Sequence, residues 1–339
     1  MLFKICGKNT SFPILIIYIE KSETPPDTIK KNIPLRFIIF FVIIPPSMRI
    51  CDILRTKKTL SFEVFPPKPE VSDLDDIYRT IDELHQFRPD FISVTFKASG
   101  DNSQHTIDLA RYIKEHTSAE PLVHLTCGSL DKEDVDRVAA VLEQERLENV
   151  LALRGDKPAD FPESYLKCFQ HASELMAYLR STHKFCMGGA CYPEGHIESE
   201  SLYDDLHHLK VKQDMGASFF ITQLFYDNNY YYRLKRVART MGITIPIIPG
   251  IMPLTSATMF NKIMHMAGAS IPFELRVLFE RFRNDKEAMF EIGIAFSVSQ
   301  ILELLANDAD GIHIYTMNNP KVAADIYQRI HHVIDKELR

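Results

Sequence analysis

The residues best suited to chemistry form a turn of Arg154, Gly155 and Asp156, which directly follows the apolar run 150–153. An apolar run of this length between turn signals is typical of a strand buried on both faces. If that strand is parallel to its neighbours, the turn places a cation, a close backbone approach and an anion at its carboxyl end. Such folds bind ligands at that end. Gly-Asp is also common in surface turns, so this run taken alone favours an ordinary turn.

Polar residues also end the other runs that we interpret as strands. These residues are Glu63, Thr95, His124, Thr126, Tyr192, Glu194, Gln223, Gly250, Tyr315 and Thr316. Each has a structural explanation: Glu63 could form a salt bridge, His124 could be a hydrogen-bonded core residue, and Gln223 could cap a helix. A hydrogen-bonding group at nearly every strand end instead predicts a polar, water-poor pocket of the kind that holds a large cofactor.

Glu63 has two interpretations that the sequence does not separate. It lies between Phe62 and Phe65 and is followed by two prolines. Burial beside aromatic rings favours the protonated form of a carboxyl group, which would make Glu63 a general acid near neutral pH. The alternative is an ionised Glu63 that is paired with an arginine or a lysine.

The order of the elements that carry these residues predicts the fold. The predicted strands are 60–65, 91–96, 122–126, 150–153, 185–191, 219–223, 245–250 and 311–315. The predicted helices are 72–87, 104–116, 132–145, 164–181, 202–215, 230–241, 255–266, 273–282, 287–305 and 321–334. Eight strands that are each followed by helix predict a (β/α)₈ TIM barrel, with a doubly wound open sheet as the alternative. That alternative normally has a Gly-x-Gly-x-x-Gly turn after its first strand, and residues 65–68 do not resemble one.

Composition narrows the class of protein. The chain has 339 residues, of which 45% are hydrophobic and 25% are charged, as is ordinary for a soluble globular protein. The net charge of −6 and the absence of a basic block argue against a nucleic-acid partner. The 6 cysteines are scattered without a Cys-x-x-Cys pair. This spacing argues against a zinc site and for reduced thiols in the cytoplasm.

The first 47 residues differ from the rest of the chain. Their apolar run, residues 37–44, is too short to span a bilayer, which takes about 20 residues. A signal peptide fits poorly, because the run lies far from the start and no small-residue cleavage site follows it. We therefore expect no membrane partner and expect residues 1–47 to lie outside the fold, with Met48 as a candidate translation start. Residues 48–339 would then form a single catalytic domain.

Nine stretches together resemble the methylenetetrahydrofolate reductases of the bacterial type. They are residues 61–68, 93–96, 124–127, 151–156, 192–196, 214–217, 221–227, 247–253 and 313–318. The resemblance implies a (β/α)₈ flavoprotein with non-covalent FAD. In this family a reduced nicotinamide gives hydride to the flavin and leaves. Methylenetetrahydrofolate then takes the same site and is reduced to 5-methyltetrahydrofolate, the methyl donor for methionine synthesis.

The resemblance also implies roles for individual residues. Glu63 looks like the acid that protonates the folate and opens its imidazolidine ring, and Asp156 looks like the carboxylate that stabilises the resulting cation. The positions that correspond to FAD contacts are Thr95, Phe96, Ala98, His124, Arg154, Gly155, Asp156, Tyr165, Tyr192, His196, Asp205 and Lys212. Arg154 and Lys212 suit the pyrophosphate. The implied substrate contacts are Glu63, Thr95, Asp156 and Gln223.

The sequence departs from the family pattern beside the flavin, in the adenosine-binding helix and at the folate end of the site. The departures are Phe96, Lys97 and Ala98 in place of Tyr-Gly-Ala, His208 and Val211 in place of polar or basic residues, and Met259 and Asn319 in place of a Gln and an Arg. The chain ends with the barrel, so we expect no regulatory domain that binds S-adenosylmethionine.

Two other functional interpretations stay open at this point. One is a barrel lyase that uses Glu63 as a base, and the other is a catalytically inactive barrel that serves as a binding or scaffold protein. The choice between NADH and NADPH is also open, because the nicotinamide site of this family is not a Rossmann fingerprint. Relatives are commonly oligomeric, so we expect a homo-oligomer.

Overall fold

The structure is a computed structural model that describes residues 48–67, 73–96, 102–155, 166–265 and 269–339. Residues 48–339 form one compact unit. The predicted extension, residues 1–47, lies outside the described residues, so its exclusion from the fold stays a prediction.

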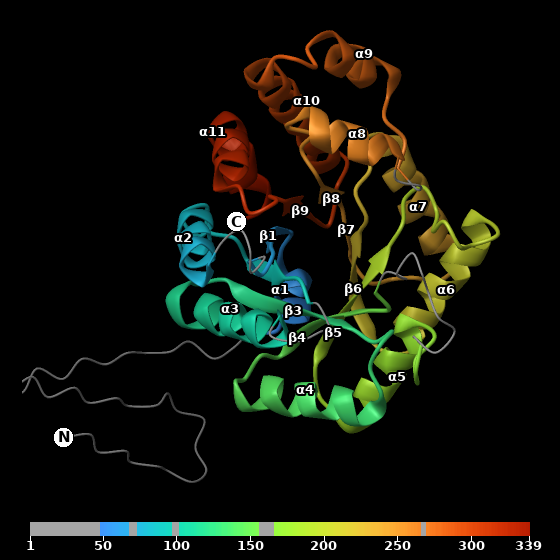
Figure 1. The fold of residues 1–339 in the computed structure, drawn as a ribbon. Coiled ribbons are helices and arrows are strands. Elements are labelled where there is room, and N and C mark those ends of the chain that lie inside the picture. Colours follow the sequence, from blue (N-terminus) through green and yellow to red (C-terminus); the bar gives the residue numbers. More distant parts are fainter. Residues whose placement is uncertain (1–47, 68–72, 97–101, 156–165, 266–268) are drawn as a thin grey trace, which may run out of the picture. The chain divides into compact units, whose positions relative to one another are not determined.

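Parallel strands form a closed barrel (Figure 1). The strands are β1 Thr59–Val64, β2 Phe91–Val94, β3 Glu120–Thr126, β4 Asn149–Leu153, β5 Cys186–Cys191, β6 Ala217–Thr222, β7 Ile247–Ile248, β8 Gly250–Ile251 and β9 Gly311–Tyr315. β7 and β8 are two halves of one strand that is interrupted at Pro249. β7 pairs with β6 and β8 pairs with β9, so this strand closes the ring. The (β/α)₈ prediction is confirmed.

Helices alternate with the strands and surround them in Figure 1. They are α1 Ile50–Thr56, α2 Leu74–His85, α3 Asn102–His116, α4 Lys132–Gln144, α5 Ala172–Thr182, α6 Leu202–Asp214, α7 Asn228–Thr240, α8 Ala257–His265, α9 Phe273–Arg281, α10 Lys286–Ala306 and α11 Pro320–Glu337. Most predicted bounds agree within a few residues. The start of α5 was predicted wrongly, because residues 166–171 are not helical. The backbone N–H of Lys167 bonds across to Gly128 at 3.3 Å instead.

The barrel interior has an apolar layer near its N-terminal end. Ile50 of α1 packs there against Phe91, Leu122, Phe219 and other inward-facing strand residues. Alternate residues of a strand face the same side, so the residues two and four positions further along point inward above this layer. Thr95, His124 and Gln223 occupy such positions.

α10 is long and apolar enough to cross a membrane by length and composition alone. Its buried residues include Gly293, Ile294, Ile301 and Leu304, which pack inside the protein. A Cβ on Gly293 would lie 1.8 Å from the carbonyl oxygen of Leu254. This close backbone approach identifies α10 as a core helix of the barrel.

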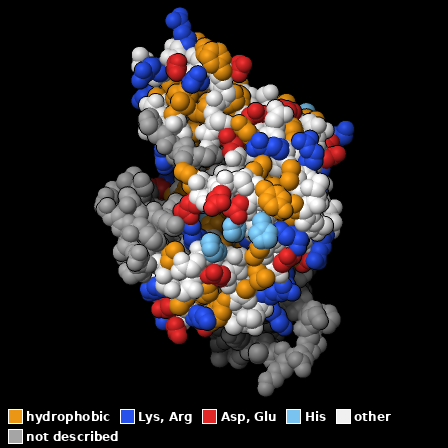
Figure 2. Space-filling view, turned by 90° about the vertical axis from the view of Figure 1, so that its right-hand side faces the viewer, with side chains coloured by type: hydrophobic (Ala, Val, Ile, Leu, Met, Phe, Trp, Pro, Cys, Tyr) orange, Lys and Arg blue, Asp and Glu red, His pale blue; other side chains and the backbone are white. Residues whose placement is uncertain are grey.

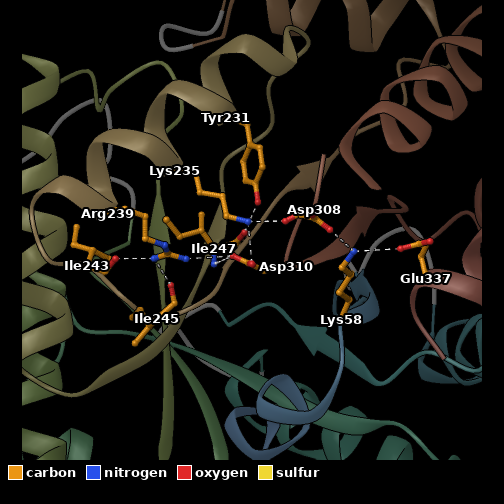
Figure 3. A network of polar contacts seen from close by, with 10 residues as sticks. All are labelled: Lys58, Tyr231, Lys235, Arg239, Ile243, Ile245, Ile247, Asp308, Asp310 and Glu337. Atoms are coloured by element: carbon orange, nitrogen blue, oxygen red, sulfur yellow. Dashed lines mark hydrogen bonds and ion pairs between the residues drawn. The ribbon is translucent and has the colours of Figure 1, made fainter. Parts of the chain in front are cut away.

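A network of polar contacts fastens the N-terminal end of the barrel (Figure 3). Asp310, directly before β9, accepts hydrogen bonds from the Ile247 backbone N–H at 2.8 Å and from Lys235 Nζ at 3.0 Å. Its carboxylate also lies 3.7 Å from Arg239 Nη2. Asp310 therefore joins β9, α7 and the interrupted strand, where the ring closes.

Replacing Asp310 by Asn should destabilise the fold by about 1–2 kcal/mol, because the amide cannot satisfy the backbone N–H and both cations together. Chemical unfolding of the purified chain would measure this free energy. Asp308→Asn is the matched control, since the Asp308 side chain is 93% exposed and exposed ion pairs contribute little. An equal free energy of unfolding for Asp310→Asn and the wild type would show that the network does not stabilise the closed barrel.

Candidate active site

A cavity of about 520 Å³ lies at the carboxyl ends of the strands. This volume is typical of small-molecule sites, which span about 300–1,000 Å³. The predicted site residues that line it are Glu63, Thr95, His124, Arg154, Gly155, Tyr192, His196, Asp205, Lys212 and Gln223. Strand ends that are far apart in the sequence thus meet around one space. Figure 2 shows histidine and acidic side chains gathered on the face at the right of Figure 1.

Four predicted site residues are not among the lining residues. Asp156, Ala98 and Tyr165 lie outside the described residues. Phe96 is described, but it is 7% exposed and packs in the main hydrophobic core. Its neighbour Thr95 faces the cavity, so alternation turns Phe96 away from it.

The positions at which the sequence departs from the family pattern also fall into two groups. His208 lines the cavity, whereas Val211, Met259 and Asn319 are not among its lining residues. The Asn319 side chain instead caps α11, where it accepts from the Lys321 backbone N–H at 3.2 Å. Lys97 lies outside the described residues.

Glu63 is buried among neutral donors and histidines. Ser93 Oγ donates to its Oε2 at 3.4 Å, and the same oxygen lies 3.5 Å from His124 Nε2 and 4.0 Å from His313 Nε2. Within the described part of the chain, Glu63 has no ion pair with a lysine or an arginine. The alternative interpretation, an ionised Glu63 paired with such a cation, therefore gains no support.

His124 lies deep in the cavity wall with an unused ring nitrogen. Burial lowers the pKa of His124, and this effect outweighs the opposite effect of the Glu63 carboxylate. Its Nε2 has no hydrogen-bond partner among the residues that the structure describes. A buried polar atom without a partner is rare in native proteins, and the Glu63 carboxylate oxygen, 3.5 Å from this nitrogen, is the acceptor within reach of it.

His313 lines the cavity but was absent from the predicted site. Its Nδ1 lies 2.8 Å from Ser61 Oγ, and its ring stacks on Phe91 and meets Tyr315 edge to face. Its position in the sequence could have identified it. His313 lies two residues before the strand-end residue Tyr315, so both side chains face the same side of the strand.

The backbone that carries Glu63 is fixed by the loop after β9. Thr316 Oγ1 donates to the carbonyl of Glu63 at 2.9 Å. The Asn318 side chain bonds both backbone groups of Phe65, at 2.8 and 2.9 Å. Asn318 has a φ of 54°, which Asn tolerates better than most residues. The loop thus extends the pairing of β1 beyond its last residue and holds Glu63 in place.

A close contact beside the interrupted strand positions Tyr315 at the same end of the cavity. Tyr315 Oη donates to the carbonyl of Thr222 at 2.7 Å. A Cβ on Gly250 would lie 2.4 Å from that carbonyl oxygen and 2.6 Å from Tyr315 Cε2. Glycine is therefore required at residue 250 for Tyr315 to reach across from β9 to β6.

Two cations lie in the cavity wall. Lys212 Nζ donates to the carbonyl of Ala190 at 2.9 Å. Burial lowers the pKa of Lys212 and raises the pKa of Asp205, while the attraction between the two charges opposes both shifts. Arg154 binds the Glu198 carboxylate with both terminal nitrogens, at 2.6 and 3.2 Å. Sequence reasoning did not identify Glu198.

Planar rings line the remaining wall. Tyr192 and His196 meet edge to face with centroids 4.6 Å apart, and His171 stacks on His208 at 5.7 Å. Such rings offer stacking surfaces to a planar ligand. The cavity therefore combines a buried carboxyl group, two cations and aromatic surfaces, which suits proton transfer to a large anionic or planar molecule.

Comparisons with known proteins agree on one family. A family model described as methylenetetrahydrofolate reductase matches residues 49–331. Methylenetetrahydrofolate reductase 1 of Schizosaccharomyces pombe is 33% identical over 293 residues, which cover 84% of this chain and 48% of that protein. The 5,10-methylenetetrahydrofolate reductase of Pectobacterium carotovorum subsp. carotovorum is 31% identical over 273 residues, which cover 80% of this chain and 89% of that protein.

The chain spans about half the length of the fission yeast and Arabidopsis thaliana relatives, 48% and 51%. Among solved structures, it resembles an uncharacterised Clostridium thermocellum protein described as binding two copies of 5-methyl-5,6,7,8-tetrahydrofolic acid. The TM-score is 0.57 at 16% identity, over 83% of this chain and 98% of the other. At that identity the likeness supports the fold alone.

Proposed function

Because the chain belongs to the methylenetetrahydrofolate reductase family, we propose that it reduces 5,10-methylenetetrahydrofolate to 5-methyltetrahydrofolate with a reduced nicotinamide dinucleotide. The observation that carries this proposal is the position of Glu63, a buried carboxyl group with histidine neighbours in the wall of the cavity. The product would supply methyl groups for methionine synthesis.

FAD is the proposed cofactor, and it supplies hydride transfer when it is bound. The residues of the cavity fit this group. Lys212 and Arg154 suit the pyrophosphate, and the rings of Tyr192 and His196 suit a planar system. Asp156 is the proposed electrostatic partner of the cationic folate, as the family pattern implies.

Glu63 is the proposed proton donor that opens the imidazolidine ring of the folate. Its burial limits competition from water, and the contacts of Thr316 and Asn318 fix the strand end that carries it. Gln223 orients its amide by accepting the Leu224 backbone N–H at 3.0 Å. Gln223 also lines the cavity, where it would contact the substrate and the nicotinamide.

Anaerobic spectroscopy of the purified full chain tests the function. We expect a yellow protein whose flavin absorption is bleached by NADH and restored by methylenetetrahydrofolate. A colourless protein that FAD cannot reconstitute would contradict the proposal and favour the lyase or the inactive barrel. Restoration of the absorption without formation of 5-methyltetrahydrofolate would also contradict it.

NADH is the proposed nicotinamide, since the relative from Arabidopsis thaliana is named as an NADH enzyme. Titrating the oxidised flavoprotein with NADH and NADPH in parallel would compare the two directly. Faster reduction at lower concentration by NADPH would overturn this choice and leave the folate reaction intact.

Glu198 should compete with the cofactor for Arg154. Replacing Glu198 by Gln should tighten FAD binding about three- to tenfold, because Arg154 loses the carboxylate partner that a phosphate would have to displace. Fluorescence titration of the apoprotein with FAD would measure the dissociation constant. Glu200→Gln is the matched control, an exposed carboxylate in the same loop. Weaker binding by Glu198→Gln would show that Glu198 orients Arg154 toward the cofactor instead.

A further inference from the structure

Two cysteines lie side by side at the N-terminal end of the barrel. Cys51 belongs to α1, and Cys186 is the first residue of β5. The Cys51 backbone N–H donates to Cys186 Sγ at 3.2 Å, across 135 residues of sequence. Both side chains pack in the apolar layer inside the barrel, and neither lines the cavity at the strand ends. The proposed reaction therefore gives this pair no role.

The two thiols also interact directly. The Cys186 thiol donates a hydrogen bond to the Cys51 sulfur, and this bond is the largest of the causes that set the pKa of Cys51, which is lowered to about 7. Burial and Asp52 oppose this effect, whereas Arg49 and Arg55 add to it. The thiolate is the reactive form of cysteine. Cys51, which is only half-buried, therefore carries a reactive sulfur near neutral pH.

The other described cysteines lack this combination. Burial raises the pKa of Cys127 to about 12 and also raises the pKa of Cys191, so both buried thiols stay protonated. Cys168 is exposed, but no cysteine is among its hydrogen-bond partners in the described residues. Cysteines that sense oxidants typically combine a low pKa, solvent access and a second cysteine nearby. Among the cysteines that the structure describes, Cys51 alone has all three properties.

We propose that Cys51 and Cys186 form a reversible disulfide when hydrogen peroxide is present. The Cys51 thiolate attacks one peroxide oxygen and the O–O bond breaks, which gives a sulfenic acid and a hydroxide that takes up a proton. The Cys186 sulfur then attacks the Cys51 sulfur. The S–O bond breaks, and the hydroxide leaves with the Cys186 proton as water. The two thiols lose two electrons in total, and the peroxide is reduced to two waters.

Cys186 is suited to the second step. Its pKa is raised first by the hydrogen bond with Cys51, then by burial and by the charge of Cys51. Conversion of Cys51 to a sulfenic acid removes the thiolate, so the contributions of Cys51 are lost when Cys186 must release its proton. The new bond would join α1 to β5 and would fasten the helix that packs into the N-terminal end of the barrel.

Peptide mapping of the native full chain tests this proposal. The protein is treated briefly with hydrogen peroxide, its free thiols are alkylated, and it is digested with trypsin without reductant. We expect peptides 50–55 and 185–210 to be linked with the loss of two hydrogen masses, and dithiothreitol to separate them. Fragmentation of the linked peptides distinguishes Cys186 from Cys191. A Cys51 thiol that stays free, or that bonds to any other cysteine, would contradict the proposal.

Trapping with dimedone, a reagent for sulfenic acids, separates the roles of the two cysteines. Cys186→Ser should give severalfold more adduct at Cys51 than the wild type, because the thiol that consumes the sulfenic acid is missing. Cys51→Ser should give no adduct at Cys186. Cys168→Ser is the matched control, since it removes an exposed thiol, and it should form the disulfide like the wild type. Wild-type labelling of Cys186→Ser, adduct at Cys186 in Cys51→Ser, or loss of the disulfide in the control would each overturn the proposal.

Discussion

Replacing Glu63 by Gln should slow methylenetetrahydrofolate reduction about 10²–10⁴-fold, the usual contribution of a general acid. The reduction of bound flavin by NADH should stay near the wild-type rate, because that hydride transfer needs no proton from Glu63. Gln has nearly the same shape and can still accept the hydrogen bond from Ser93 Oγ. The variant therefore removes the transferable proton and leaves the surroundings largely in place.

Stopped-flow spectroscopy of the two half-reactions separates this role from a structural one. Glu194→Gln is the matched control. Glu194 also follows a strand, but its carboxylate accepts from the backbone and side chain of Ser270 and does not line the cavity. The control should be normal in both half-reactions. Equal losses in both half-reactions of Glu63→Gln would show that Glu63 only supports the fold.

The strand ends were predictable because parallel strands impose a simple geometry. Glu63, His124 and Gln223 belong to three strands that are distant in sequence, yet all three line one cavity. Their meeting follows from the order of the strands around the ring and from the alternation of faces along each strand. The apolar runs predicted those strands, and only the interruption at Pro249 divided one of them.

Contacts between separate segments could not be predicted in the same way. Glu198 reaches Arg154 across 44 residues, and Lys212 of α6 reaches the carbonyl of Ala190 in β5. Periodicity describes one element at a time, whereas these pairs depend on how separate elements and loops pack around the cavity. His313 was missed for a different reason, because it lies between Ile312 and Ile314 and looks like part of an ordinary strand. The role of Asp156 stays a prediction.

Replacing Lys212 by Met should weaken FAD binding about 10- to 100-fold, since a charge-assisted hydrogen bond to a phosphate contributes about 1.5–3 kcal/mol. Met keeps most of the aliphatic stem, so packing against β5 is retained. Lys210→Met is the matched control on α6, because Lys210 forms an exposed ion pair with Asp214. Fluorescence titration of each apoprotein with FAD would measure the affinities. Equal losses in both variants would indicate a general effect of charge on α6.

The pH dependence of FAD binding gives Lys212 a second, independent signature. Burial lowers the pKa of Lys212, so in the free protein its charge is present below that lowered pKa and is lost as the pH rises through it. As the pH rises, the affinity of the wild-type protein for the anionic cofactor should therefore begin to fall at a lower pH than it would if Lys212 were exposed. Lys212→Met has no charge at this position to lose, so its weaker affinity should lack this step. A step of the same size in Lys212→Met would assign the pH dependence to another group and leave Lys212 without its proposed role.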